Sequence, residues 1–262
     1  MMTNFQDKPN IFQALNNAAI NFSETFQTIN KIWVNAAKAF LQYDAQIRQA
    51  IQAIPLAIDE ALKNGAEKMK TDLITLGQYG WYISMNMPAS VPVKIAEKLL
   101  AGEVDDVNRL MCDYFEKNWE ELKEDIVEMC PSRSILLDRA FAAHQRGEYE
   151  LSIPVFLAQS DGICKELAGY ELFRKKGGVP ATSEFVDQFT ADSIMMALLE
   201  PFRSPMPISA SEKERQGMQV PFNRHQILHG EVVDYGTRVN SCRAISLLAY
   251  VYSVLKMAKE SK

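Results

Sequence analysis

Two of the three histidines in this 262-residue chain lie four positions apart, next to an arginine. They are His225 and His229, in the run PFNRHQILHG, where Arg224 precedes His229 by five positions. An imidazole can accept and donate a proton at cellular pH, and a guanidinium offers a permanently charged, planar fork to phosphate oxygens. These residue types at this spacing indicate acid–base chemistry on a ligand that carries phosphate.

Other polar residues could assist this group. Asn223 could hold a phosphate or orient Arg224, and Asp161 could support the site from a neighbouring helix. Positions five apart on an ideal helix are separated by about 140°, an angle that the long arginine side chain can cover. Arg224 and His229 could instead be structural, tying their helix to its neighbours by hydrogen bonds. Which of His225 and His229 would transfer the proton is left open by the sequence.

A metal site is the alternative reading of the two histidines. His225 and His229 share one helix face, and their spacing suits two ligands of zinc, but Glu231 or Asp234 would have to complete the set. We therefore expect no metal at this site and no cofactor in the protein. The third histidine, His144, stands alone near the end of a predicted helix, and we expect it to cap that helix or to lie on the surface.

Charge is distributed unevenly along the chain. The whole chain carries a formal charge of −5, but residues 203–262 hold nine basic and five acidic residues, a local difference of +4. A globally basic nucleic-acid binder is excluded, whereas local, salt-dependent attraction of phosphate to the end of the chain is compatible with this pattern. Hydrophobic residues make up 47% and charged residues 23%, which excludes a long disordered chain and a fibrous repeat.

The cysteines and the apolar segments indicate a cytoplasmic protein without membrane contact. None of the four cysteines forms a CxxC pair, and we expect reduced, buried thiols at positions 112, 130, 164 and 242. The first residues, MMTNFQDKPN, lack the basic and apolar regions of a signal peptide. The uncharged run from Leu73 to Val93 is interrupted by glycines and prolines, which is unlike a membrane span.

The elements that must position these residues are predicted to be helices. Apolar residues recur at helical spacing through most of the chain, and no segment alternates strictly enough to predict a strand. The predicted helices cover about residues 28–62, 103–128, 131–147, 149–176, 182–200, 222–232 and 238–259. We expect Pro55 to kink the first, Asn64-Gly65 to end it and Thr237 to cap the last.

Two regions are expected along the chain. Residues 77–92 hold two glycines, two prolines and the run Trp81-Tyr82-Ile83, which indicates an ordered aromatic connector. We place the boundary there, between an N-terminal helical region of unknown role at 1–80 and a helical bundle at 81–262. The connector is too apolar for a flexible linker, so the two regions are expected to pack together.

The motif and its surroundings resemble a known family. Arg224, four intervening residues and His229 form an R-x4-H motif in the second-last predicted helix, which resembles the HEPN (higher eukaryotes and prokaryotes nucleotide-binding) superfamily. The run NRHQILHG, the following DYGT and the apolar last helix are similar to a bacterial branch of that superfamily, as is the segment 152–163. The resemblance covers roughly residues 81–262.

The resemblance implies an all-α, up-and-down bundle of four or five helices that pairs as a homodimer. It implies a metal-independent endoribonuclease that cleaves RNA by attack of the ribose 2′-hydroxyl, with His229 transferring protons and Arg224 stabilising the phosphorane. It further implies a hydrolase of phage defence or of a toxin–antitoxin system, with a cognate antitoxin or regulatory protein as a partner. The alternative is a non-catalytic HEPN-like module that binds RNA, a nucleotide or a protein.

The last helix supplies a second argument for a dimer. Ile245, Leu248, Tyr252 and Leu255 share one face, and neighbouring apolar residues widen it. A face this broad could exceed what one bundle covers, so we expect a second copy of the chain to pack there.

Overall fold

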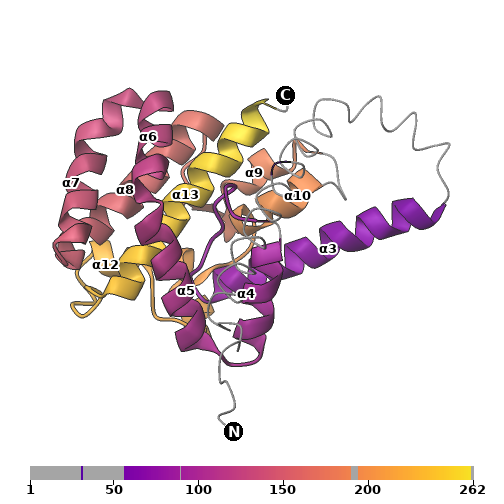
Figure 1. Cartoon of the computed structure of the whole chain (residues 1–262), viewed down its shortest axis with the longest axis horizontal. Helices are drawn as coiled ribbons and strands as arrows, with labels where there is room; N and C mark the ends of the chain where they lie inside the picture. Colours follow the sequence, from indigo (N-terminus) through magenta and orange to yellow (C-terminus); the bar gives the residue numbers. More distant parts are fainter. Residues whose placement is uncertain (1–30, 32–55, 89, 190–193, 261–262) are drawn as a thin grey trace, which may run out of the picture. The chain divides into compact units, whose positions relative to one another are not determined.

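The computed structural model describes residue 31 and residues 56–88, 90–189 and 194–260. Residues 54–262 form one compact unit, and the described part is mostly helical, so the prediction of an all-α fold is confirmed. Figure 1 shows its α-helices and one short hairpin. The helices are α3 (Leu56–Gln78), α4 (Ser90–Leu100), α5 (Val104–Lys117), α6 (Trp119–Met129), α7 (Ser134–Gln145), α8 (Tyr149–Ala168), α9 (Ser183–Val186), α10 (Ile194–Leu199), α11 (Glu212–Arg215), α12 (Arg224–Leu228) and α13 (Arg238–Glu260).

The centre of this unit is α13. It packs against α8 on one side and α5 on another, and α7 covers α8 in turn (Figure 1). The apolar residues of its predicted face are all buried, among them Ile245 and Leu248 at 0% exposure. The argument that this helix offers an uncovered face to a second copy is therefore wrong, because the helices of the same unit surround it.

Polar groups on α13 fix its position among these helices. The Tyr252 hydroxyl donates to the carbonyl oxygen of Asp125 in α6, and the Tyr250 hydroxyl donates to that of Leu198 in α10, both at 2.6 Å. Buried hydroxyls need such partners, since an unpaired one would cost about 1–3 kcal/mol. The pairs therefore determine where α6 and α10 sit along the central helix.

The helix α3 runs past the stop expected at Asn64-Gly65 and ends at Gln78. A glycine inside a helix costs about 1 kcal/mol relative to alanine. Burial of Leu73 and Leu76 in the same helix outweighs that cost. Apart from residue 31, the predicted helix from residue 28 lies outside the described residues up to residue 55. Helix α3 packs against α4 and α10 within the compact unit.

The helix predicted at residues 103–128, which is rich in aspartate and glutamate, forms two helices rather than one. Helix α5 ends at Lys117 and α6 begins at Trp119, with Asn118 between them. Their apolar residues Val107, Phe115 and Ile126 are buried while most acidic side chains face solvent, as the amphipathic pattern predicts. The segment from Pro131 also begins as predicted, with a 3₁₀ turn η1 (Pro131–Arg133) that leads into α7.

The segment after α8 differs from the prediction. The helix ends at Gly169, whose φ of +83° allows a left-handed cap, and not at Gly177-Gly178. Those two glycines form the turn of a hairpin between strands β1 (Lys175–Lys176) and β2 (Val179–Pro180). The run from Arg174 to Lys176 thus belongs to the hairpin and not to a helix terminus.

Between α10 and α12 the chain forms short turns. Two 3₁₀ helices, η2 (Glu200–Phe202) and η3 (Pro207–Ser209), begin with or contain proline, as the prolines in this stretch predict. A capping box between Ser211 and Glu214 then starts α11. Among the described helices, none combines the length and the hydrophobicity that a bilayer crossing requires.

Candidate functional site

Asn223 builds the start of the helix that carries the motif. Its side-chain oxygen accepts hydrogen bonds from the backbone amides of His225 and Gln226, which makes it the N-cap of α12. Its Nδ2 donates to the carbonyl oxygens of Pro207 at 2.7 Å and Ala210 at 2.9 Å. Asn223 is buried, and both of its Nδ2 protons are used, so its side chain positions α12 and has no donor left for a phosphate.

Arg224 is the first residue of α12 and is half-buried. The carbon of its guanidinium group lies 5.3 Å from the centroid of the Phe173 ring, a cation–π distance. Its Nε is buried without a hydrogen-bond partner, and within the described residues no carboxylate lies within 4.0 Å of the guanidinium. The charge of Arg224 is therefore held by an aromatic ring and is not neutralised by an acid.

Asp161 reaches the motif indirectly. Its Oδ1 accepts a hydrogen bond of 2.7 Å from the backbone amide of Leu172, in the segment that follows α8. The next residue of that segment is Phe173, whose ring lies against Arg224. Asp161 thus fixes the loop that supports the arginine, and no ion pair joins Asp161 to Arg224 within the described part of the chain.

The rings of the two histidines lie against each other, His225 coming from the first turn of α12 and His229 from its C-cap. Their ring centroids are 4.2 Å apart with an angle of 44° between the planes. His229 is the C-cap residue and is exposed, and the His225 side chain is 59% exposed, with its Nε2 lying 3.4 Å from Glu231. In the described structure the His229 ring has no hydrogen-bond or ion-pair partner, so it is available to a ligand.

The loop after the motif is pinned to α8. Gly230 turns the chain with a φ of +72°, and the Tyr235 hydroxyl then donates to the carbonyl oxygen of Glu150 at 3.1 Å. Gly236 allows the same approach, since a Cβ there would lie 2.1 Å from a carboxylate oxygen of Glu150. Thr237 accepts a hydrogen bond from the amide of Asn240, which confirms the predicted cap of the last helix.

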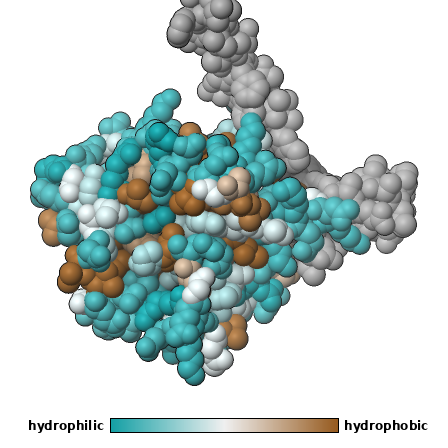
Figure 2. All heavy atoms as spheres, turned by 90° about the horizontal axis from the view of Figure 1, so that it is seen from below, coloured by the Kyte–Doolittle hydropathy of each residue, from teal (hydrophilic) through white to brown (hydrophobic). Residues whose placement is uncertain are grey.

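Apolar side chains are exposed on the elements around the motif. Leu228 on α12, Val233 in the following loop and Leu151 at the start of α8 are 39%, 86% and 62% exposed. Figure 2 views the unit from below Figure 1 and shows hydrophobic groups separated by hydrophilic ones. The surface beside the motif is thus partly apolar, although α13 itself is covered.

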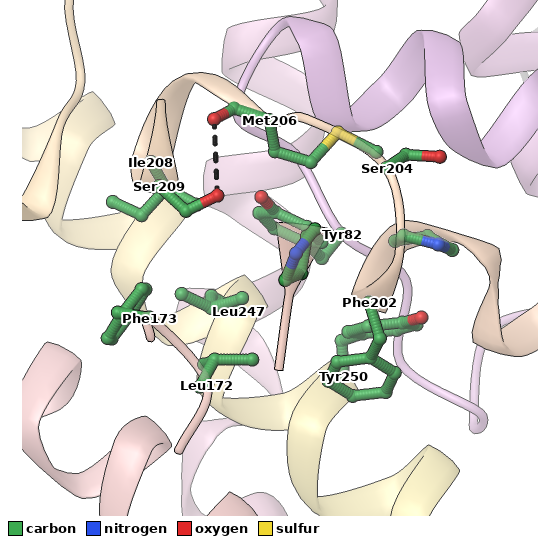
Figure 3. A pocket seen from close by; sticks show the side chains of 12 residues that line it. Tyr82, Leu172, Phe173, Phe202, Ser204, Met206, Ile208, Ser209, Leu247 and Tyr250 are labelled. Carbon is green, nitrogen blue, oxygen red and sulfur yellow. Dashed lines mark hydrogen bonds between the residues drawn. The ribbon is translucent and has the colours of Figure 1, made fainter. Parts of the chain in front are cut away.

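Phe173, whose ring lies against Arg224, also lines a small pocket. Figure 3 shows the aromatic and aliphatic side chains around it, from α13, from the segment after α3 and from residues 172–209. Its volume is about 30 Å³, room for two water molecules on the order of 10–15 Å³ each. A nucleotide does not fit there, so the pocket is not a candidate for the base-binding part of the site.

A second polar cluster lies at the junction of α5, α7 and α13. One oxygen of Glu116, one ring nitrogen of His144 and the sulfur of Cys242 all lie within 4.8 Å of one another. His144 is 5% exposed and Cys242 is fully buried. The expectation that His144 caps a helix or lies on the surface is therefore wrong, because it faces α13 from the buried side of α7.

Each member of this cluster is held by further contacts. Nδ1 of His144 is hydrogen-bonded to the Ser241 hydroxyl at 2.8 Å, and Ser241 is in turn bonded to the Ser152 hydroxyl at 2.9 Å. Burial lowers the pKa of His144, which favours the neutral imidazole. The hydrogen bond from Arg238 lowers the pKa of Glu116, which keeps that carboxylate ionised.

Cys112 extends the cluster along α5. It precedes Glu116 by four positions and so lies on the same helix face, and a hydrogen bond from Cys242 lowers the pKa of the Cys112 thiol. All four cysteines are buried and free, as the sequence predicts. The signal that could have indicated this cluster is the four-residue spacing of Cys112 and Glu116, but nothing in the sequence places His144 beside them.

Comparisons with protein-family models, with curated proteins and with solved structures gave no match. The chemistry of this chain must therefore be argued from the two residue groups described above.

Proposed function

We propose that this protein is a metal-independent endoribonuclease of the HEPN type, with Arg224 and His229 as its active residues. The proposal rests on the absence, within the described residues, of an acidic partner for either of these two side chains, which lie at the two ends of one short helix. The guanidinium has no acidic partner and the imidazole is exposed without one, within the residues described. A cation and a proton carrier without such partners suit a phosphodiester.

The reaction would proceed by transfer within the substrate. His229 removes the proton from a ribose 2′-hydroxyl, the 2′-oxygen forms a bond to the adjacent phosphorus, and the bond from phosphorus to the 5′-oxygen breaks. The departing 5′-oxygen takes a proton from an imidazolium, which leaves a 2′,3′-cyclic phosphate and a 5′-hydroxyl. Arg224 donates to the non-bridging oxygens as negative charge builds on them.

A second copy of the chain would complete this site. Arg224 and His229 occupy opposite ends of a helix of five residues, and positions five apart diverge by about 140°. One copy therefore offers its arginine and its histidine in different directions, and two copies facing each other at α12 would bring both sets onto one phosphate. Leu228, Val233 and Leu151 supply exposed apolar surface beside the motif for this contact.

The test is cleavage of RNA by single variants. We expect Arg224→Ala and His229→Ala each to lower the rate about 10²–10⁴-fold, because each removes one member of a cooperating pair. His225→Ala should be milder, and Arg139→Ala, which removes an exposed arginine from α7, should match the wild type. Added EDTA should leave the initial rate unchanged. Undiminished cleavage by Arg224→Ala would refute the assignment of this site.

The second candidate is a non-catalytic module that binds RNA or a nucleotide. The half-buried position of Arg224 against Phe173 favours it, since this geometry anchors an anion without requiring a reaction. The two functions differ in one assay outcome. If the wild type binds RNA without cutting it, and Arg224→Ala weakens that binding, the module is the correct reading.

The biological setting that we propose is phage defence or a toxin–antitoxin pair, in which a cognate antitoxin or regulatory protein restrains the enzyme. Expression of the wild type should then slow the growth of a bacterial host. The Arg224→Ala protein should not, at equal expression, since the effect depends on cleavage.

A further inference from the structure

We propose that the cluster at the junction of α5, α7 and α13 binds one zinc ion, through Glu116, His144 and Cys242. The site is separate from α12 and would be structural. A thiolate, an imidazole and a carboxylate form a ligand set that suits Zn²⁺ and that Mg²⁺ or Ca²⁺ would not select. Three helices contribute one ligand each, so the ion would hold together elements that are far apart in the sequence.

Two distances within the cluster lie close to the edges of a zinc tetrahedron, and all three ligand atoms lie within 4.8 Å of one another. With bonds of about 2.0–2.2 Å to nitrogen and oxygen and about 2.3 Å to sulfur, a tetrahedral ion sets its ligands about 3.4–3.6 Å apart. His144 Nε2 lies 3.6 Å and Cys242 Sγ lies 3.8 Å from the same Glu116 oxygen, Oε1. The first distance is longer than a hydrogen bond, so Nε2 of His144 is not paired with the carboxylate, whereas the Cys242 thiol donates to Oε1 and would lose its proton on binding zinc.

The histidine is already oriented as a ligand. Its Nδ1 is hydrogen-bonded to the Ser241 hydroxyl, which is hydrogen-bonded to the Ser152 hydroxyl. The Ser152 hydroxyl in turn donates to the carbonyl oxygen of Tyr149 at 3.3 Å. A donor chain that runs from Nδ1 to that carbonyl leaves Nε2 with its lone pair directed at Glu116 and Cys242. Metal-bound histidines generally have such a partner on the other nitrogen, which sets both tautomer and ring orientation.

The surrounding charges balance a divalent ion. Cys112, whose thiol interacts with Cys242, could take the fourth position. Two thiolates and the carboxylate of Glu116 would leave a net charge of −1 around Zn²⁺. Arg238, which is bonded to both oxygens of Glu116 and to Asp113, would offset it. Zinc would replace the bond of Arg238 to Oε1 and leave its bonds to Oε2 and Asp113.

The first experiment uses the untagged wild-type protein. Elemental analysis after purification without chelator should find about one zinc per chain. Removal of the metal and addition of Co²⁺ should produce a thiolate-to-cobalt charge-transfer band together with the visible bands of a tetrahedral ion. A protein that holds no zinc, and that gives no such bands with Co²⁺, would overturn the proposal. So would a Cys112–Cys242 disulfide found in its place.

Variants then locate the site, with metal content and affinity as readouts independent of RNA cleavage. Cys242→Ser and His144→Ala should abolish stoichiometric zinc, whereas Cys164→Ser, a fully buried cysteine in α8 with none of these neighbours, should retain it. Ser241→Ala should weaken zinc binding about 10–100-fold in a chelator competition, as loss of an outer partner does. Equal zinc content in Cys242→Ser and wild type would refute this location, and failure of the ribonuclease proposal would leave these results unchanged.

Discussion

Asn223 provides the sharpest test of how the motif is built, because every polar group of its side chain is used inside the protein. Replacement by alanine removes the acceptor for the amides of His225 and Gln226 and the donor for the carbonyl oxygens of Pro207 and Ala210. Loss of an N-cap costs about 1 kcal/mol, and each of the two lost bonds to the carbonyls costs about 1 kcal/mol more. We therefore expect Asn223→Ala to lower the free energy of unfolding by about 3 kcal/mol.

Urea unfolding followed by tryptophan fluorescence measures this change, since Trp81 and Trp119 both lie in the compact unit. The midpoint should fall at an unchanged slope, which identifies a loss of stability. Asn86→Ala, at an exposed asparagine, should stay within about 0.5 kcal/mol of the wild type. A wild-type midpoint for Asn223→Ala, combined with weaker RNA binding, would show that Asn223 touches the ligand and would refute the structural reading.

Three further predictions concern stability. The hydrogen bond from Lys175 lowers the pKa of Glu214 to about 2. The stability that the ionised Glu214 adds to the folded state is therefore complete above the ordinary pKa of 4.5 and is lost as the pH falls towards 2. Acid titration of Glu214→Gln should show less destabilisation across that range than the wild type does. Gly80→Ala and Gly102→Ala both place a side chain at positive φ, at a cost of about 1–2 kcal/mol. Thermal melts should show the larger loss for Gly80→Ala, whose Cβ would lie 3.0 Å from Arg243, and equal losses would show that the contact is harmless. Leu248→Ala in the centre of α13 should cost about 2–5 kcal/mol in urea, and a loss below 1 kcal/mol would contradict its place in the core.

The sequence predicts local features of this fold well. The period of the apolar residues identifies α8 and α13, and Thr237 stands where the last helix begins, as predicted, whereas the sequence did not indicate Asn223 as the N-cap of α12. These signals depend on neighbouring residues within one or two turns. They succeed because the apolar residues that a helix buries recur at helical spacing within the same segment of sequence.

The errors have a different origin. The position of His144, alone near the end of a predicted helix, indicates a cap or a surface residue, yet its partner Ser241 comes from α13, 97 residues later. The face of α13 that was expected to be uncovered is covered by α8 and α5, and the apolar pattern of α13 contains no information about which helices pack on it. Asn64-Gly65 did not end α3 because residues further along that helix are buried. Each outcome was decided by which elements meet, which periodicity does not specify.

The central position of α13 also has a consequence for how the unit folds. Ser246 accepts a hydrogen bond from the amide of Tyr82 across 164 residues, and Tyr252 donates to Asp125 across 127. Chain segments this distant meet only after large loops close, so folding should be slow for a helical protein. Because the surrounding layers share one helix, they should also open together. Amides in the middle of α13 should therefore exchange with solvent only through global unfolding, while those of α12 exchange through local fluctuations.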